Sequence, residues 1–124
     1  MSTRVLVADD SGTMRKIIIR SLNVVGVSDI VEAADGNQAC ELFDRKEFDI
    51  VLTDWNMPGK TGLEVLQYIR SSGSTIPVML ITTEGEKCRV MQAIQAGVSD
   101  YLVKPFDTAS LRAKLEKHVT LAGV

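Results

Sequence analysis

Residues 50–59 read Ile50-Val51-Leu52-Thr53-Asp54-Trp55-Asn56-Met57-Pro58-Gly59. The first four positions are apolar or β-favouring without a break. Such a run is typical of a parallel strand that is covered on both faces of its sheet. Asp54 follows directly, so we expect a buried strand that ends on a carboxylate.

Four further runs of the same kind lie on either side of this stretch. Each is short and mostly apolar on consecutive residues, as expected for buried strands. The run in the 30s is the weakest of them. The predicted strands are Val5–Ala8, Ile30–Val31, Val78–Thr82 and Tyr101–Val103.

The segments between these runs carry apolar residues at helical spacing. We expect Thr61 to begin the third helix as its N-cap, and Gly26 and Gly97 to end the first and fourth helices. The predicted apolar stripes are Met14, Ile17, Ile18, Leu22 and Val25; Ala39, Leu42 and Phe43; Gly62, Val65, Leu66 and Ile69; Val90, Met91, Ala93 and Ile94; and Leu111, Leu115, Val119 and Ala122.

Strand and helix alternate strictly along the chain. This pattern predicts right-handed crossovers and a parallel sheet with helices on both faces. The expected fold is a doubly wound, three-layer α/β sandwich of five strands and five helices, in a strand order that periodicity does not give. With 124 residues and no linker or repeat, the chain is expected to form one domain over 1–124.

Composition excludes several classes of function. A net charge of −2 argues against nucleic-acid binding as the main activity. No stretch is long and apolar enough to span a bilayer, and the N-terminus has no signal-peptide layout, so we expect a cytoplasmic protein. Cys40 and Cys88 lie far apart and are expected to be free thiols. His118 is the only histidine, expected to be solvated near the end of the last helix.

Polar side chains follow or end four of the predicted strands. Asp9 and Asp10 follow the first, Asp54 follows the third, Thr82 ends the fourth and Lys104 follows the fifth. In open α/β sheets, ligands bind at the carboxyl edge of the strands. We therefore expect these residues, distant in sequence, to converge in one small pocket.

Such a pocket has a definite chemistry. Three carboxylates in a partly dry site repel one another and require a cation. Oxygen ligands without histidine or cysteine favour Mg²⁺, with Mn²⁺ possible, over Zn²⁺. The ammonium of Lys104 and the hydroxyl of Thr82 would suit phosphoryl oxygens, and an aspartate oxygen of the pocket could then attack phosphorus in line.

The motifs together resemble the receiver domains of two-component response regulators, above all the stand-alone regulators of chemotaxis. The resemblance runs from Arg4 to about Val119 and implies a flavodoxin-like (βα)5 fold. It is carried by Asp9-Asp10, Asp54-Trp55-Asn56-Met57-Pro58-Gly59, Ile81-Thr82, Ala96-Gly97 and Tyr101-Leu102-Val103-Lys104-Pro105-Phe106.

The resemblance implies a role for each site residue. Asp54 would accept the phosphoryl group. Asp10, Asp54 and the backbone carbonyl of Asn56 would bind Mg²⁺, and Asp9 would act through a metal-bound water. Lys104, across a cis bond to Pro105, and Thr82 would contact the phosphoryl oxygens.

The resemblance also implies a switch and its partners. A sensor histidine kinase would supply the phosphoryl group, and Tyr101 would move inward with Thr82. A downstream protein, the flagellar motor switch or another effector, would then bind the surface of Lys87, Val90, Tyr101 and Lys114. We expect a monomeric signalling switch that promotes its own phosphorylation and dephosphorylation, not a metabolic enzyme.

Other interpretations stay open. The chain could relay its phosphoryl group to a histidine phosphotransfer protein, or be a receiver cut from a larger regulator. A small Mg²⁺-dependent aspartyl-phosphate phosphatase also uses an aspartate at a strand end. Such enzymes carry a second carboxylate two residues later as acid and base, whereas this chain has Asn56 there. Two interpretations of Trp55 also stay open: a cover over the site, or a half-exposed loop aromatic.

Overall fold

The computed structural model describes residues 3–83 and 87–119, without the side chains of residues 87 and 88. Strands and helices alternate from one end of this part to the other. In chain order they are β1 Arg4–Ala8, α1 Gly12–Val24, β2 Asp29–Ala33, α2 Gly36–Arg45, β3 Ile50–Asp54, α3 Gly62–Ser71, β4 Val78–Thr82, α4 Lys87–Gln95, β5 Asp100–Val103 and α5 Thr108–Glu116.

The strands form one sheet in the order β2-β1-β3-β4-β5, and every neighbouring pair is parallel. The chain therefore starts near the centre of the sheet and builds outward in two directions. The register places Asp54 opposite Ile81 and Thr82 opposite Val103. The carboxyl ends of β3, β4 and β5 thus lie level with one another.

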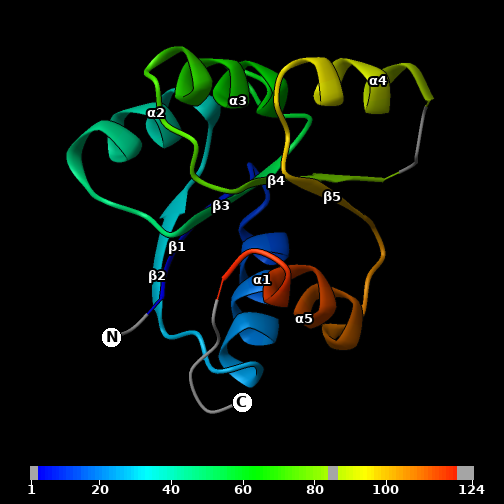
Figure 1. Ribbon diagram of the computed structural model, residues 1–124. Helices are drawn as coiled ribbons and strands as arrows, with labels where there is room; N and C mark the ends of the chain where they lie inside the picture. The colour runs from blue at the N-terminus through cyan, green and yellow to red at the C-terminus, as the bar shows by residue number, and fades with distance from the viewer. Residues whose placement is uncertain (1–2, 84–86, 120–124) are drawn as a thin grey trace.

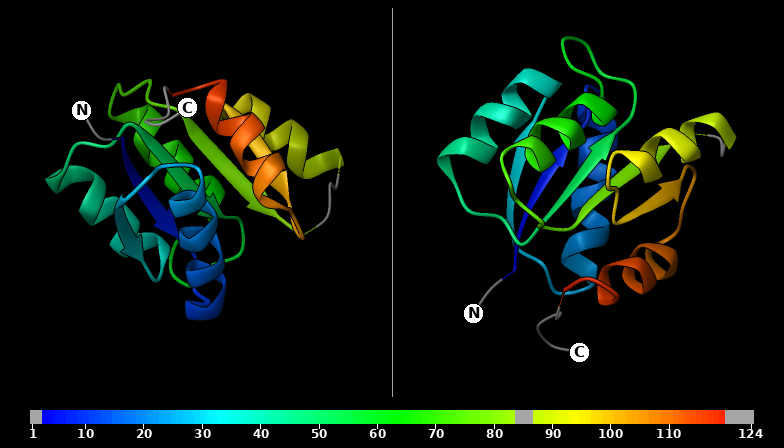
Figure 2. Two further views of the ribbon diagram at one scale, coloured as in Figure 1. Left: turned by 90° about the horizontal axis from the view of Figure 1, so that it is seen from below. Right: turned by 45° about the horizontal axis from the view of Figure 1, so that its top comes forward.

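The helices cover both faces of the sheet. Helices α2, α3 and α4 lie on one face, and α1 and α5 lie on the other (Figure 1). Figure 2 shows the same division from two other directions. Two buried apolar clusters fill the spaces between layers, one under each set of helices, and both draw side chains from the central strands. The predicted three-layer sandwich and its parallel sheet are confirmed.

Local signals at helix ends are also confirmed. Thr61 caps α3: its hydroxyl accepts from the backbone N–H of Glu64, and the Glu64 carboxylate accepts from the backbone N–H of Thr61. This reciprocal pair is a capping box. Gly26 and Gly97 have φ of 97° and 91°, the left-handed conformation that favours glycine after a helix.

Three apolar positions were predicted on the wrong side of their helices. Ile17 on α1 is 45% exposed, and Met91 and Ile94 on α4 are 57% and 59% exposed. Each helix packs through a narrower stripe than its apolar residues suggest: Ile18 and Leu22 on α1, and Ala93 on α4. In addition, α5 ends at Glu116, and the predicted contact of Ala122 lies outside the described residues.

Candidate functional site

The carboxyl edge of the sheet gathers polar side chains in a buried setting. Asp9 follows β1, Asp54 ends β3, Thr82 ends β4 and Lys104 follows β5. Asp9, Asp54 and Thr82 are 1%, 7% and 6% exposed, and with Thr53 they are the buried polar residues of the described part of the chain. Polar groups are rarely buried this completely without partners, so each of these side chains is expected to have a polar partner.

Lys104 joins two of these carboxylates. Its Nζ lies 3.1 Å from Oδ1 of Asp54 and 3.2 Å from Oδ2 of Asp9. The backbone N–H of Lys104 donates to the carbonyl of Thr82, which ties the residue to the end of β4. The Lys104–Pro105 peptide bond is cis, as predicted. The ammonium is therefore held at the point where β1, β3 and β5 end.

Asp9 is held through both its side-chain carboxylate and its backbone carbonyl. Its Oδ1 accepts from the backbone N–H of Ser11 at 2.9 Å, and its carbonyl accepts from Nη1 of Arg15 at 2.6 Å. Ser11 in turn caps α1 through the N–H of Met14. The turn between β1 and α1 thus holds Asp9 in one orientation. Sequence reasoning missed the part of Arg15, which lies on the first turns of α1.

The acidic residues are close enough to share a cation. Oxygens of Asp9, Asp10 and Asp54 lie within 4.8 Å of one another, and Asp10 is the exposed member. This donor set consists of carboxylates alone, the hard oxygen ligands that Mg²⁺ prefers. The residues present therefore fit a magnesium or manganese ion. Asn56, whose backbone carbonyl was predicted as a further ligand, is exposed in the loop just after Asp54.

The electrostatics of Asp54 reflect this crowding. Burial raises the pKa of the Asp54 carboxyl above its ordinary value. Lys104 opposes this rise through its charge and its hydrogen bond, while the charges of Asp9 and Asp10 add to it. The ionised form of Asp54 is thus disfavoured, and a cation bound nearby would favour it.

Gly62 allows the chain to pack tightly around Asp54. A Cβ atom at this position would lie 2.2 Å from the carbonyl oxygen of Asp54. The N–H of Gly62 donates to the carbonyl of Trp55 at 2.8 Å. The start of α3 therefore sits directly against the end of β3, and only glycine fits there.

The predicted switch residues, Thr82 and Tyr101, lie at the same edge of the sheet as Asp54. Thr82 is buried and Thr83 is exposed. Tyr101 is half-buried, and the ammonium of Lys114 lies 5.3 Å from the centroid of its ring. Val90 on α4 is half-buried nearby, and the side chain of Lys87 lies outside the description. Thr82 and Tyr101 line one small cavity of about 10 Å³ with Trp55 and Arg89.

His118 is placed differently from the sequence prediction. Instead of being a solvated group at a helix end, its Nε2 lies 3.3 Å from Oδ2 of Asp100, and its side chain is 19% exposed. Lys114 donates to the other oxygen of Asp100 at 2.9 Å. Lys114 and His118 are four residues apart, a spacing that puts both on one side of the final turns, and this signal could have found the pair.

The hydrogen bonds to Asp100 together outweigh the effect of burial on its pKa. Burial alone would raise the pKa of this carboxyl, but hydrogen bonds from Lys114, the backbone of Tyr101 and His118 together hold the pKa below its ordinary value. Asp100 is therefore a fixed anion between β5 and α5. It connects the predicted partner residues Tyr101 and Lys114.

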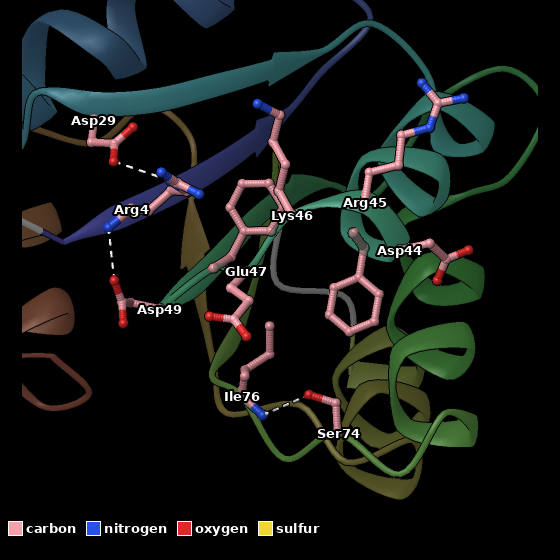
Figure 3. Close-up of a pocket in the computed structure, with 11 residues that line it drawn as sticks. Arg4, Asp29, Asp44, Arg45, Lys46, Glu47, Asp49, Ser74 and Ile76 are labelled. Atoms are coloured by element: carbon pink, nitrogen blue, oxygen red, sulfur yellow. Dashed lines mark hydrogen bonds and ion pairs between the residues drawn. The ribbon is translucent and has the colours of Figure 1, made fainter.

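A much larger hollow, of about 880 Å³, lies at the opposite edge of the sheet. It is lined by residues at the amino ends of the strands, among them Arg4, Asp29, Asp49 and Ile76 (Figure 3). Arg4 there forms an ion pair with Asp29, and its backbone N–H donates to the carboxylate of Asp49. Size alone does not mark the functional site: the buried charges gather at the carboxyl edge.

Comparison with known proteins agrees with this geometry. The response regulator receiver domain family matches residues 5–116. Chemotaxis protein CheY-3 of Vibrio cholerae serotype O1 is 41% identical over 116 residues, which cover 92% of this chain and 89% of that protein. Chemotaxis protein CheY1 of Helicobacter pylori is 44% identical over 116 residues, which cover 91% of this chain and 94% of that protein.

Solved structures share the same fold. Chemotaxis protein CheY4 of Vibrio cholerae superposes with a TM-score of 0.90 at 29% identity, over 96% of this chain and all of that one. The receiver domain of the Francisella response regulator 1452 gives a TM-score of 0.86 at 28% identity, over 94% of this chain and 95% of that one. The chain belongs to the response regulator receiver domain family, and its fold is the flavodoxin-like fold of that family.

Proposed function

We propose that this chain is a phosphorylation-driven switch that accepts a phosphoryl group on Asp54 from the phosphohistidine of a sensor kinase. The observation that carries the proposal is the position of Lys104. Its ammonium lies within 3.2 Å of both Asp54 and Asp9, beside the exposed carboxylate of Asp10. A carboxylate held this way, next to a fixed positive charge, suits attack on a phosphoryl group.

The transfer step conserves charge and atoms. A carboxylate oxygen of Asp54 forms the new O–P bond as the N–P bond of phosphohistidine breaks, and the electron pair of that bond stays on the imidazole nitrogen. Lys104 then pairs with a phosphoryl oxygen, and the hydroxyl of Thr82 donates to another. Both groups stabilise charge at the transferred phosphorus without moving a proton to it.

Asp10, Asp54 and the carbonyl of Asn56 would hold Mg²⁺, or Mn²⁺, and Asp9 would reach it through a bound water. The ion, when bound, supplies positive charge that offsets both the carboxylates and the phosphoryl oxygens. The raised pKa of Asp54 is consistent with this assignment: burial is its main cause, the charges of Asp9 and Asp10 add to it, and a bound cation would favour the ionised carboxylate.

The output would be a protein-binding surface. Thr82 and Tyr101 would rearrange together after phosphorylation and change the face formed by Lys87, Val90, Tyr101 and Lys114. The names of the curated relatives favour a chemotaxis partner, the flagellar motor switch or another effector. Alignment over 89% and 94% of these relatives supports a single receiver domain over 1–124. We propose that it works alone, as a cytoplasmic monomer.

Within residues 3–83 and 87–119, no helix has the length and apolar character needed to cross a bilayer. The two faces of the sheet are instead covered by helices that bury apolar side chains against it.

Incubation with acetyl phosphate and Mg²⁺, followed by intact-mass measurement, tests the proposal. We expect a gain of one phosphoryl group that disappears in Asp54→Asn and when the metal is chelated. Asp44→Asn, which removes an exposed aspartate of α2, serves as the matched control and should be phosphorylated normally. Undiminished labelling of Asp54→Asn would refute the assignment of the acceptor.

A further inference from the structure

Trp55 joins the phosphoryl site to its surroundings. It directly follows Asp54, and the residue is 8% exposed. Its backbone N–H donates to the carbonyl of Ile81 at 3.0 Å, and its carbonyl accepts from Gly62 at 2.8 Å. The backbone of Trp55 is therefore held on both sides, directly next to Asp54.

Arg89 on α4 stacks on this ring. Its guanidinium carbon lies 5.2 Å from the centroid of the Trp55 ring, within the range of a cation–π contact. Trp is the aromatic partner that binds cations most strongly. This contact joins α4, which belongs to the proposed output surface, to the residue next to the proposed phosphoacceptor.

The stack closes the space that the switch residues share. Trp55 and Arg89 are two walls of the cavity of about 10 Å³, and Thr82 and Tyr101 are two others. A volume of this size holds about one water molecule. A phenol ring that moves further inward therefore needs one wall to yield, and Arg89 holds the α4 wall against Trp55.

We infer that the Arg89–Trp55 stack is a latch that holds α4 in its unphosphorylated position and sets how readily the phosphoryl group moves it. The inference rests on the proposed function, because it assigns a cost to the conformational change that phosphorylation would drive. A contact made only in the unphosphorylated form reduces the population of the other form. Its removal should thus tighten binding of any phosphoryl mimic.

The magnitude follows from the strength of cation–π contacts. Loss of one partly exposed contact should shift the two-state equilibrium, and with it the affinity for a mimic, about two- to fivefold. Beryllofluoride is a suitable probe, since its beryllium coordinates a carboxylate oxygen in the place of a phosphoryl group and no phosphoryl transfer occurs. Titration calorimetry in Mg²⁺ buffer measures its affinity without using tryptophan as the reporter.

Four proteins form a double-mutant cycle: the wild type, Arg89→Ala, Trp55→Leu and the double variant. We expect Arg89→Ala to bind beryllofluoride about two- to fivefold more tightly, with a smaller gain from Arg89→Ala once Trp55 is already leucine. Arg45→Ala, an exposed arginine at the end of α2, should bind like the wild type. If Trp55→Leu does not fold, Trp55→Phe takes its place and should reduce the effect of Arg89→Ala.

Two results would overturn the latch while leaving the proposed function intact: wild-type affinity in Arg89→Ala, or equal effects of Arg89→Ala with and without Trp55. The second would mean that Arg89 acts through another partner. A wild-type protein that binds no beryllofluoride would overturn the proposed function and the latch together, so the two failures are distinguishable.

Discussion

The ammonium of Lys104 lies 3.1 Å from Oδ1 of Asp54, in a pair that joins the end of β3 to the loop after β5. The same nitrogen lies 3.2 Å from Asp9, so one cation serves two buried carboxylates. In the unliganded protein Lys104 therefore has a structural part to play before any phosphoryl group arrives. Removing the ammonium of Lys104 should therefore lower the stability of the fold as well as impair phosphorylation.

Lys104→Met should lower the free energy of unfolding by about 3 kcal/mol without metal, because it leaves two buried carboxylates without their partner. Urea denaturation in a chelating buffer measures this change. Lys16→Met, at an exposed position of α1, is the matched control and should change stability by less than about 0.5 kcal/mol. Equal stability of the two variants would contradict the inferred importance of the pair.

At pH values above the raised pKa of Asp54, Asp54→Asn should stabilise the unliganded protein by on the order of 1 kcal/mol, since it removes a disfavoured buried charge. Because the folded-state pKa of Asp54 is raised, the folded wild type binds more protons than the unfolded chain between the ordinary value of 3.8 and the raised value. Stability of the wild type therefore falls as pH rises through that window.

The advantage of Asp54→Asn should accordingly shrink as the pH falls through the same window and level off below it. Thermal unfolding at a series of pH values, with metal chelated, measures the difference. A stabilisation that does not vary with pH would show that the gain comes from packing and not from the charge.

Gly62→Ala should destabilise the protein by about 2 kcal/mol and reduce phosphorylation, because the new methyl group collides with the carbonyl of Asp54. Gly12→Ala is its control. A Cβ at Gly12 meets only the guanidinium of Arg15 at 3.5 Å, an ordinary contact. That variant should be neutral or slightly more stable. Denaturation curves and initial rates of labelling would separate the two, and a well-tolerated Gly62→Ala would refute the close packing.

Asp100→Asn should destabilise the protein by about 1 kcal/mol at neutral pH, because it weakens the contacts with Lys114 and His118. The pKa of Asp100 is lowered in the folded state, so its contribution is present above the ordinary value of 3.8 and is lost as pH falls through the folded value.

The difference between wild type and Asp100→Asn should therefore disappear in acid. Glu116→Gln breaks the exposed pair with Arg112 and should have little effect at any pH. A constant difference between Asp100→Asn and wild type across the pH range, or an equal effect in Glu116→Gln, would contradict this account of the cluster.

Much of the fold was predictable from sequence because the strands are apolar on consecutive residues. The capping box at Thr61 and the glycines after α1 and α4 are local signals as well, and each is where the sequence places it. The strand order was not predictable. It depends on which strands pair, and the apolar pattern within one strand does not identify the strands beside it.

The site was predictable as a meeting of strand ends but not in its side-chain contacts. Asp9, Asp54, Thr82 and Lys104 end or follow parallel strands, so their convergence follows from topology. The stack of Arg89 on Trp55 and the pairing of His118 with Asp100 join side chains whose mutual orientation depends on how the helices settle on the sheet. Ile17, Met91 and Ile94 are exposed for the same reason: an apolar residue at helical spacing is buried only where something covers it.

Chemical identification of the modified residue tests the central claim most directly. The protein would be treated with acetyl phosphate and Mg²⁺, reduced with borohydride, which converts an aspartyl phosphate to homoserine, and sequenced as peptides by tandem mass spectrometry. We expect homoserine at position 54 and nowhere else. Homoserine at position 9 or 10, or a stable phosphate on a hydroxyl side chain with position 54 unchanged, would contradict it.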